Sequence, residues 1–89
     1  MNQQILLRWE RHSDKRYHVA FLCWDLLGDL VLTKVWGGIG KATDQHHNTH
    51  VNTVADGLAL IDMIIKRRRQ RGYELVNGLS NIQEFANAV

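Results

Sequence analysis

The stretch that decides the fold reads Leu30-Val31-Leu32-Thr33-Lys34-Val35-Trp36-Gly37-Gly38-Ile39-Gly40. Its first half is apolar and rich in β-branched residues and follows the turn residues Gly28 and Asp29, which is typical of a β-strand. Three glycines within four positions end it. Because glycine tolerates positive φ and lets other groups approach the backbone, the cluster predicts a sharp exit from the strand. Trp36 precedes that exit, either as a core residue or as a stacking surface.

Further strands are expected on both sides of this stretch. Residues 5–11 alternate between apolar and polar side chains, as in a half-buried strand. Residues 16–24 are apolar on both faces, which indicates a central strand. Residues 41–50 are polar, but the sheet would otherwise keep an open edge, so we expect an edge strand there. A short last strand is expected at residues 73–76.

A single helix is predicted from about Val54 to Arg71. Thr53 is a good N-cap and Asp56 follows three residues later, close to a capping box. Gly72 is the expected stop. One apolar stripe faces the core and consists of Val54, Leu58, Ile61 and Ile65. The predicted fold class is α+β, an antiparallel β-sheet of four to five strands with one α-helix packed across it.

The whole chain of 89 residues is expected to form one domain, with a core at about residues 5–76 and a tail at 77–89. In the tail, Ile82, Phe85 and Ala86 hint at a turn of helix. The net charge of +2 says little about partners by itself. Because the sequence has neither a membrane-spanning apolar run nor a signal peptide, we expect a cytoplasmic protein with no membrane contact.

Neither catalysis nor a cofactor is expected. Cys23 lies in an apolar strand, away from the electropositive surroundings of a reactive thiol, and residues 37–42 lack the spacing of a phosphate-binding loop. A zinc site needs three or four ligands in fixed geometry. Of His46, His47 and His50, only the first and last would share a face of a strand. We therefore expect no enzyme activity and no metal site.

The pentapeptide from Trp36 to Gly40 resembles the Trp-Gly-Arg-Ile/Val-Gly signature of the WGR domain family. That family occurs as small bacterial proteins and as a DNA-sensing module of poly(ADP-ribose) polymerases. Residues 16–21 resemble the family's Tyr-x-Leu-Gln-Leu strand, and residues 71–73 resemble the Lys-Gly-Tyr after its helix. Lys34 stands where the family often has Arg. The resemblance covers roughly residues 5–76 and implies a WGR-like domain.

One position departs from this family pattern. The family's signature arginine is Gly38 here. In the polymerases that Trp and that Arg contact the DNA end, so the resemblance carries over only Trp36. Glycine offers at most a backbone N–H to a phosphate, whereas arginine offers a fork of donors. Weak DNA binding is therefore the expectation, with Lys34 and Lys41 supplying charge.

The basic run at residues 66–71 has two interpretations, a phosphate-binding patch or a solvated helix end that complements the helix dipole. Our leading hypothesis is a non-enzymatic module that binds nucleic acid, DNA in particular. The alternative is a protein–protein interaction domain that docks a partner on its sheet edge or apolar surface. The candidate nucleic-acid-binding residues are Lys34, Trp36, Gly37, Lys41, Arg67 and Arg69.

Overall fold

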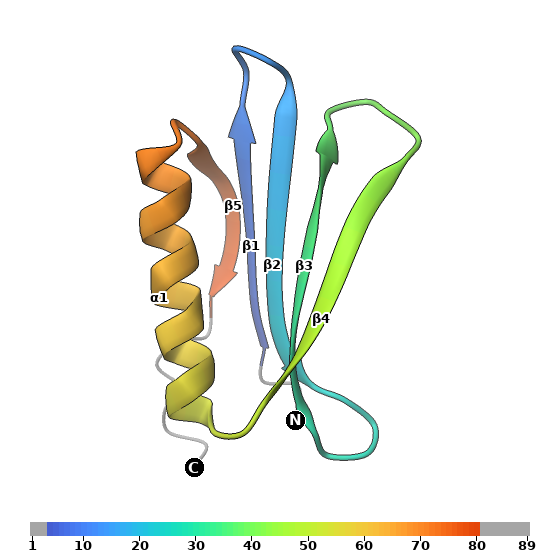
Figure 1. The fold of residues 1–89 in the computed structure, drawn as a ribbon, viewed down its shortest axis with the longest axis vertical. Coiled ribbons are helices and arrows are strands. Elements are labelled where there is room, and N and C mark those ends of the chain that lie inside the picture. Colours follow the sequence, from blue (N-terminus) through green and yellow to red (C-terminus); the bar gives the residue numbers. More distant parts are fainter. Residues whose placement is uncertain (1–3, 81–89) are drawn as a thin grey trace.

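Five antiparallel strands form one sheet, and one helix packs against it (Figure 1). The structure, a computed structural model, describes residues 4–80. The elements are β1 (Gln4–Arg11), β2 (Arg16–Trp24), β3 (Leu30–Gly38), β4 (Asp44–Val51), α1 (Val54–Gln70) and β5 (Glu74–Ser80). The strand order is β4-β3-β2-β1-β5. The predicted α+β fold is confirmed, including the antiparallel pairing of β2 with β3.

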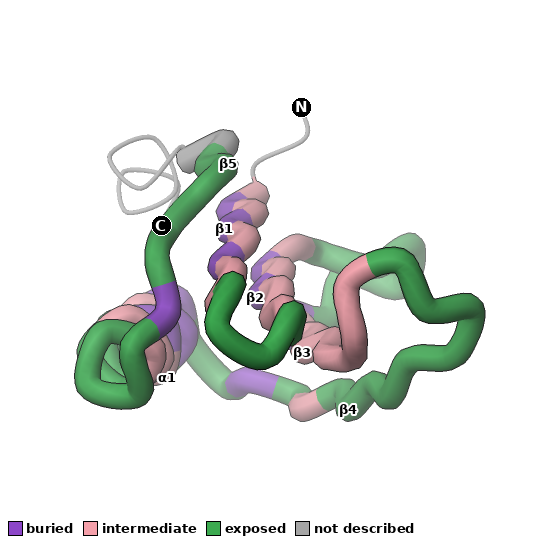
Figure 2. The backbone as a smooth tube through the Cα atoms, turned by 90° about the horizontal axis from the view of Figure 1, so that it is seen from above, coloured by how far each residue is buried: buried purple, intermediate pink, exposed green. Residues whose placement is uncertain are grey.

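The helix joins the two edges of the sheet. β4 and β5 are the outermost strands, so the chain must cross the sheet between them, and α1 makes that crossing. Seen from above, the strands form a curved row and α1 lies along one side of it (Figure 2). The other side of the row carries no helix within residues 4–80.

The core lies between α1 and the sheet face that α1 covers. Alternate residues of β1 point to this face, and antiparallel pairing sets Ile5 beside Leu22 and Leu22 beside Leu32. Ile5 and Leu22 are 0% exposed and Ile61 of α1 is 2% exposed. The other buried apolar residues are Leu7, Trp9, Ala20, Leu30, Leu32, Val51, Val54 and Tyr73. The predicted helix face is therefore confirmed.

Both ends of α1 are capped as the sequence predicts. The Thr53 side chain accepts a hydrogen bond from the Asp56 backbone N–H at 3.1 Å. Gly72 has a φ of 81°, and its N–H bonds to the carbonyl of Arg69 at 3.1 Å. The Tyr73 N–H bonds to the carbonyl of Arg68 at 2.9 Å. These two bonds form a Schellman motif, which satisfies carbonyls that the helix leaves open.

The last strand differs from its prediction. It runs from Glu74 to Ser80 instead of from 73 to 76, because β1 offers a partner along its length, with Ser80 opposite Ile5. Pairing therefore continues past residue 76, the expected limit of the core. Tyr73 belongs to the helix stop and is buried. The helical turn expected around Ile82, Phe85 and Ala86 lies outside the described residues.

A glycine lets α1 approach the sheet closely. A Cβ on Gly57 would lie 3.0 Å from Cδ2 of Leu22 and 3.5 Å from Cδ2 of Leu30. We expect Gly57→Leu to lower the free energy of unfolding by about 1–3 kcal/mol through overpacking, although glycine itself disfavours helix by about 1 kcal/mol. Urea melts measure this, with Ala59→Leu on the exposed face as the control. Equal stability of the two variants would contradict this packing.

Candidate nucleic-acid interface

A groove of about 590 Å³ lies between the C-terminal half of α1 and strands β2, β3 and β4. Aromatic, apolar and basic side chains form its walls, and none of its described lining residues is acidic. It is lined by Trp9, His18, Val19, Leu32, Lys34, Trp36, Thr49, Leu60, Met63, Ile64, Lys66, Arg67, Arg68 and Gln70. We refer to this surface as the α1 groove.

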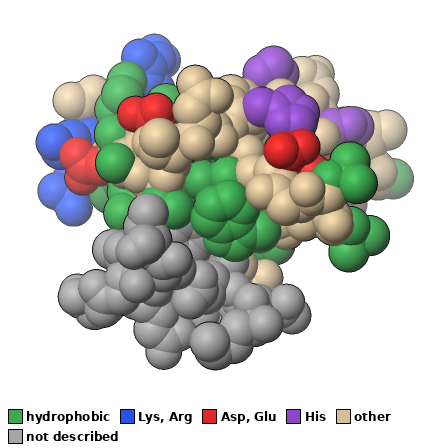
Figure 3. All heavy atoms as spheres, turned by 90° about the horizontal axis from the view of Figure 1, so that it is seen from below, with side chains coloured by type: hydrophobic (Ala, Val, Ile, Leu, Met, Phe, Trp, Pro, Cys, Tyr) green, Lys and Arg blue, Asp and Glu red, His purple; other side chains and the backbone are tan. Residues whose placement is uncertain are grey.

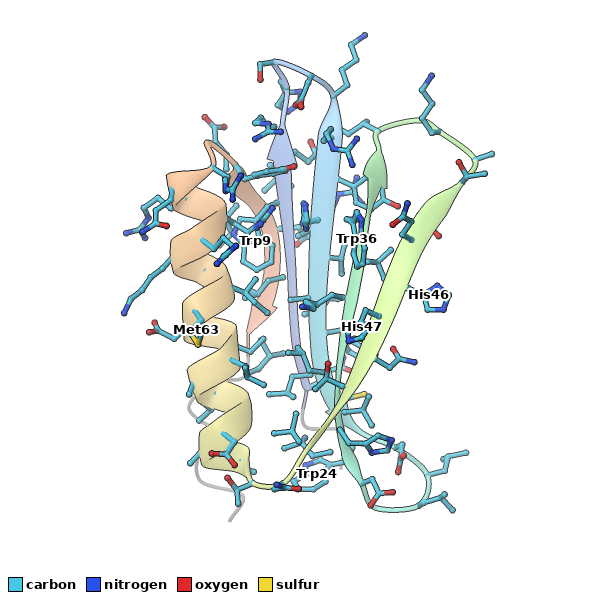
Figure 4. The ribbon with its side chains drawn as sticks, in the orientation of Figure 1. Trp9, Trp24, Trp36, His46, His47 and Met63 are labelled. Carbon is cyan, nitrogen blue, oxygen red and sulfur yellow. The ribbon has the colours of Figure 1, made fainter. Side chains whose placement is uncertain are left out.

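The groove exists because α1 packs tightly on the sheet with its N-terminal half and leaves space beside its C-terminal half. The buried residues of α1 are Val54, Gly57 and Ile61, all in its first half. Along β3 the side chains on the helix side change from Leu30 and Leu32 to Lys34 and Trp36. The groove lies between these side chains and the second half of α1. Trp36 lies in the upper half of β3 (Figure 4).

A cluster of rings lies at the upper end of the groove. Strand pairing sets His18 opposite Trp36, and their rings stack with centroids 6.3 Å apart and planes 14° apart. His18 also meets Tyr73 edge-on, at 5.0 Å between centroids. The guanidinium of Arg68 lies 4.9 Å from the centre of the Tyr73 ring, and Arg11 lies over the same ring at 4.5 Å. Trp36 is half-buried, so part of its surface faces the groove.

His18 holds Arg68 in place. Nη1 of Arg68 lies 2.8 Å from Nε2 of His18, and because a guanidinium only donates, the histidine accepts as a neutral ring. The pKa of His18 is lowered from 6.5 to about 4, first by burial and then by the positive charge of Arg68, with smaller contributions from Arg16, Arg11 and Lys34. The geometry and the charge state therefore agree.

This neutral histidine makes stability depend on pH. Between pH 6.5 and about 4 the unfolded chain takes up a proton that folded His18 resists. The contribution of His18 to stability should therefore fall as the pH drops through this window and change little below it. Thermal melts between these pH values should show a smaller loss of melting temperature in His18→Gln than in the wild type. Parallel pH profiles would contradict a neutral His18 in the fold.

The cations at the groove are largely unpaired. Within residues 4–80 the ion pairs are Arg8 with Glu10, Arg11 with Asp14, His12 with Glu10 and Lys66 with Asp62. No carboxylate of this described part pairs with Lys34, Arg67 or Arg68. Burial lowers the pKa of the Arg68 guanidinium, yet the group keeps its charge because arginine titrates far above neutral pH. This surface is therefore suited to an anion.

The structure brings only some of the predicted site residues together. Lys34, Trp36 and Arg67 line the α1 groove. Gly37 and Lys41 line a separate hollow of about 750 Å³ between the β1–β2 turn and the β3–β4 loop, which Trp36 also borders. That hollow includes two acidic residues, Asp14 and Asp44.

Arg69 lies apart from the other predicted site residues. It lines a third hollow of about 450 Å³ between α1 and β5, away from Trp36. Helical geometry explains the separation, because neighbouring residues of a helix point in different directions.

Two residues of the groove, Arg68 and His18, were not among the predicted site residues, although Arg68 belongs to the basic run at residues 66–71. Arg68 continues the buried stripe of α1, three residues after Ile65 and seven after Ile61, so its position in the helical period was a usable signal. His18 alternates with Ala20 and Leu22 on the face that α1 covers. The partners of His18, Trp36 and Arg68, come from distant segments, and no local sequence pattern predicts these contacts.

The histidines of β4 point to different sides. His46 lies opposite Val35, whereas His47 lies opposite Lys34, and their side chains leave the strand in different directions (Figure 4). No group of three His, Cys, Asp or Glu side chains in the described part of the chain is arranged to hold a metal ion. Burial raises the pKa of the Cys23 thiol and Asp25 raises it further, which keeps the sulfur protonated.

Comparison of the chain with models of known protein families, with curated proteins and with solved structures finds no significant match. The only helix among the described residues is too short and too polar to cross a membrane. The α1 groove and the residues around Trp36 are therefore the features of this chain that bear on its function.

Proposed function

We propose that this chain is a non-enzymatic binding module that contacts DNA through the α1 groove. One observation carries the proposal: Lys34 of β3 and Arg67 of α1, more than thirty residues apart, line one groove with the half-buried Trp36, and no described carboxylate pairs with either cation. Phosphates need positive charge and bases or sugars need an apolar face, and this surface offers both. The resemblance to the WGR family supports DNA as the polyanion.

Each residue has a distinct part in the proposed contact. Lys34 and Arg67 attract phosphates as charges on the two walls of the groove, and each phosphate that they neutralise releases counterions. Arg68 is held by His18 and Tyr73, so its guanidinium loses little further freedom on binding. Trp36 offers its accessible surface for stacking. The contact is binding without a chemical step.

The hollow beside Gly37 and Lys41 fits a phosphate less well. Its lining has three basic residues, Lys15, Arg16 and Lys41, but also Asp14 and Asp44, whereas the described lining of the α1 groove has no acidic residue. The Asp44 carboxylate accepts a hydrogen bond from the Tyr17 hydroxyl at 3.2 Å. Negative charges repel a polyanion, so we place the main contact in the α1 groove. Lys41 then lies at the margin of the contact.

Removing one groove cation tests this placement. We expect Arg67→Gln to weaken binding and to reduce the log–log salt slope of the affinity by about 0.9, as for the loss of one phosphate contact. Arg69→Gln is the matched control, since it removes the same charge on the other side of α1. Fluorescence anisotropy with a labelled nicked duplex at two salt concentrations measures both. Equal effects of the two substitutions on affinity and salt slope would show that DNA is attracted to the basic helix end in general, and would contradict a contact in the groove.

A protein-docking domain is the second candidate function. Leu26, Leu27, Leu75 and Val76 are all exposed, and Leu75 and Val76 lie on the edge strand β5. The two functions differ in their response to salt, because phosphate binding weakens steeply with added salt and an apolar interface changes little.

A further inference from the structure

The turn between β2 and β3 presents two leucines directly to solvent. Leu26 is 104% exposed and Leu27 is 87% exposed. The turn that carries them is held by its own hydrogen bonds. The Asp25 carboxylate accepts from the backbone N–H of Leu27 at 2.9 Å and of Asp29 at 2.8 Å. The Gly28 N–H donates to the Asp25 carbonyl at 3.1 Å, and its φ of 84° suits glycine. The leucines are thus fixed in an outward position.

The chemistry of this turn is complementary to that of the α1 groove. The turn presents apolar side chains flanked by two carboxylates, Asp25 and Asp29. The groove has apolar walls, including Leu32, Leu60 and Ile64, and its cations Lys34, Arg67 and Arg68 lack ion-pair partners among the described residues. Acidic flanks would be repelled by anionic lipid, which argues against insertion of the turn into a membrane. A basic groove of a protein suits it better.

Within one chain the two surfaces do not meet. Leu26 and Leu27 are 104% and 87% exposed, so neither side chain lies in the groove of its own chain, although the groove extends to Leu32, two residues after Leu30. The view from below shows hydrophobic and acidic side chains next to histidines on the side away from α1, and Lys and Arg side chains together with acidic ones on the α1 side (Figure 3).

We propose that the Leu26–Leu27 turn of one copy docks in the α1 groove of a second copy. The two surfaces differ, so the contact is heterologous, and a dimer as a whole keeps one free turn and one free groove. Assembly therefore continues past the dimer into chains or rings. A single turn in a groove buries less than a standard interface of about 1,600 Å², so the association is weak and needs high protein concentration. The proposal uses the geometry of the groove and does not depend on DNA binding.

Sedimentation velocity of the purified protein, without nucleic acid, tests this assembly from about 10 μM to about 1 mM. The mean mass of the wild type should rise with concentration and pass that of a dimer. The turn variant Leu26→Ser/Leu27→Ser and the groove variant Lys34→Glu/Arg67→Glu should each stay monomeric. Leu75→Ser, an exposed leucine on β5, is the control and should assemble like the wild type.

An equimolar mixture of the turn and groove variants gives the sharpest result. The turn variant retains a working groove and the groove variant retains a working turn, so the mixture should form one-to-one dimers and stop there. A wild type that stays monomeric at about 1 mM would overturn the proposal, and so would a turn variant that still assembles. A mixture that stays monomeric would also overturn it. Because DNA is absent, such a failure would leave the proposed DNA contact standing.

Discussion

Replacing Ile61 with alanine is expected to lower the free energy of unfolding by about 2–5 kcal/mol. Ile61 is 2% exposed and lies at the centre of the buried stripe of α1, against the sheet. Truncation removes buried apolar surface and leaves a cavity that the closed end of the core cannot easily collapse. A small domain has only about 5–15 kcal/mol of stability, so this substitution removes a large share of it.

Met63→Ala is the matched control for this effect. Met63 lies two residues further along α1 and is 64% exposed, so its truncation should change stability little. Urea melts of both variants, analysed at a common slope, give the two free energies. Equal shifts of the two midpoints would show that α1 packs with a different face on the sheet.

Replacing Trp36 with alanine should weaken DNA binding by roughly 1–3 kcal/mol, the usual contribution of stacking on one base. That corresponds to a dissociation constant about five- to 150-fold higher. Trp36 also stacks on His18, so a thermal melt must show that the variant is folded. Trp24→Ala is the matched control, because Trp24 lies at the opposite end of the sheet (Figure 4). Unchanged affinity in a folded Trp36→Ala variant would show that Trp36 does not contact the DNA.

Gly38→Arg should act in the opposite direction. Gly38 is not among the glycines with positive φ, so an arginine does not strain the backbone there. Its Cβ would lie 2.7 Å from Cγ of Lys41, a flexible exposed side chain that can move aside. Position 38 lines the hollow that Trp36 also borders, so the new guanidinium adds positive charge at the margin of the contact and should steepen the salt slope by about 0.9 for one added phosphate contact. A folded Gly38→Arg variant that binds no tighter would contradict this.

Most strands and the helix of this protein can be predicted from short segments of its sequence. Alternation predicted β1, the doubly apolar pattern of residues 16–24 predicted a central β2, and Thr53 and Gly72 marked the ends of α1. The buried face of α1 also followed from its period. These features can be predicted because local sterics, capping and hydrophobic spacing depend on residues within a few positions of one another.

The chemical groups that meet in the α1 groove are brought together by strand pairing and by the packing of α1. The pairing of β2 with β3 sets His18 beside Trp36, and the packing of α1 brings Arg68 to the same point, fifty residues further along the chain. The same packing places Arg67 at the groove and Arg69 at the hollow beside β5, after helical geometry has turned them to different sides of α1. β5 is longer than its own residues indicate because β1 supplies partners for its hydrogen bonds. Register and packing are properties of two distant segments together, so no single segment encodes them.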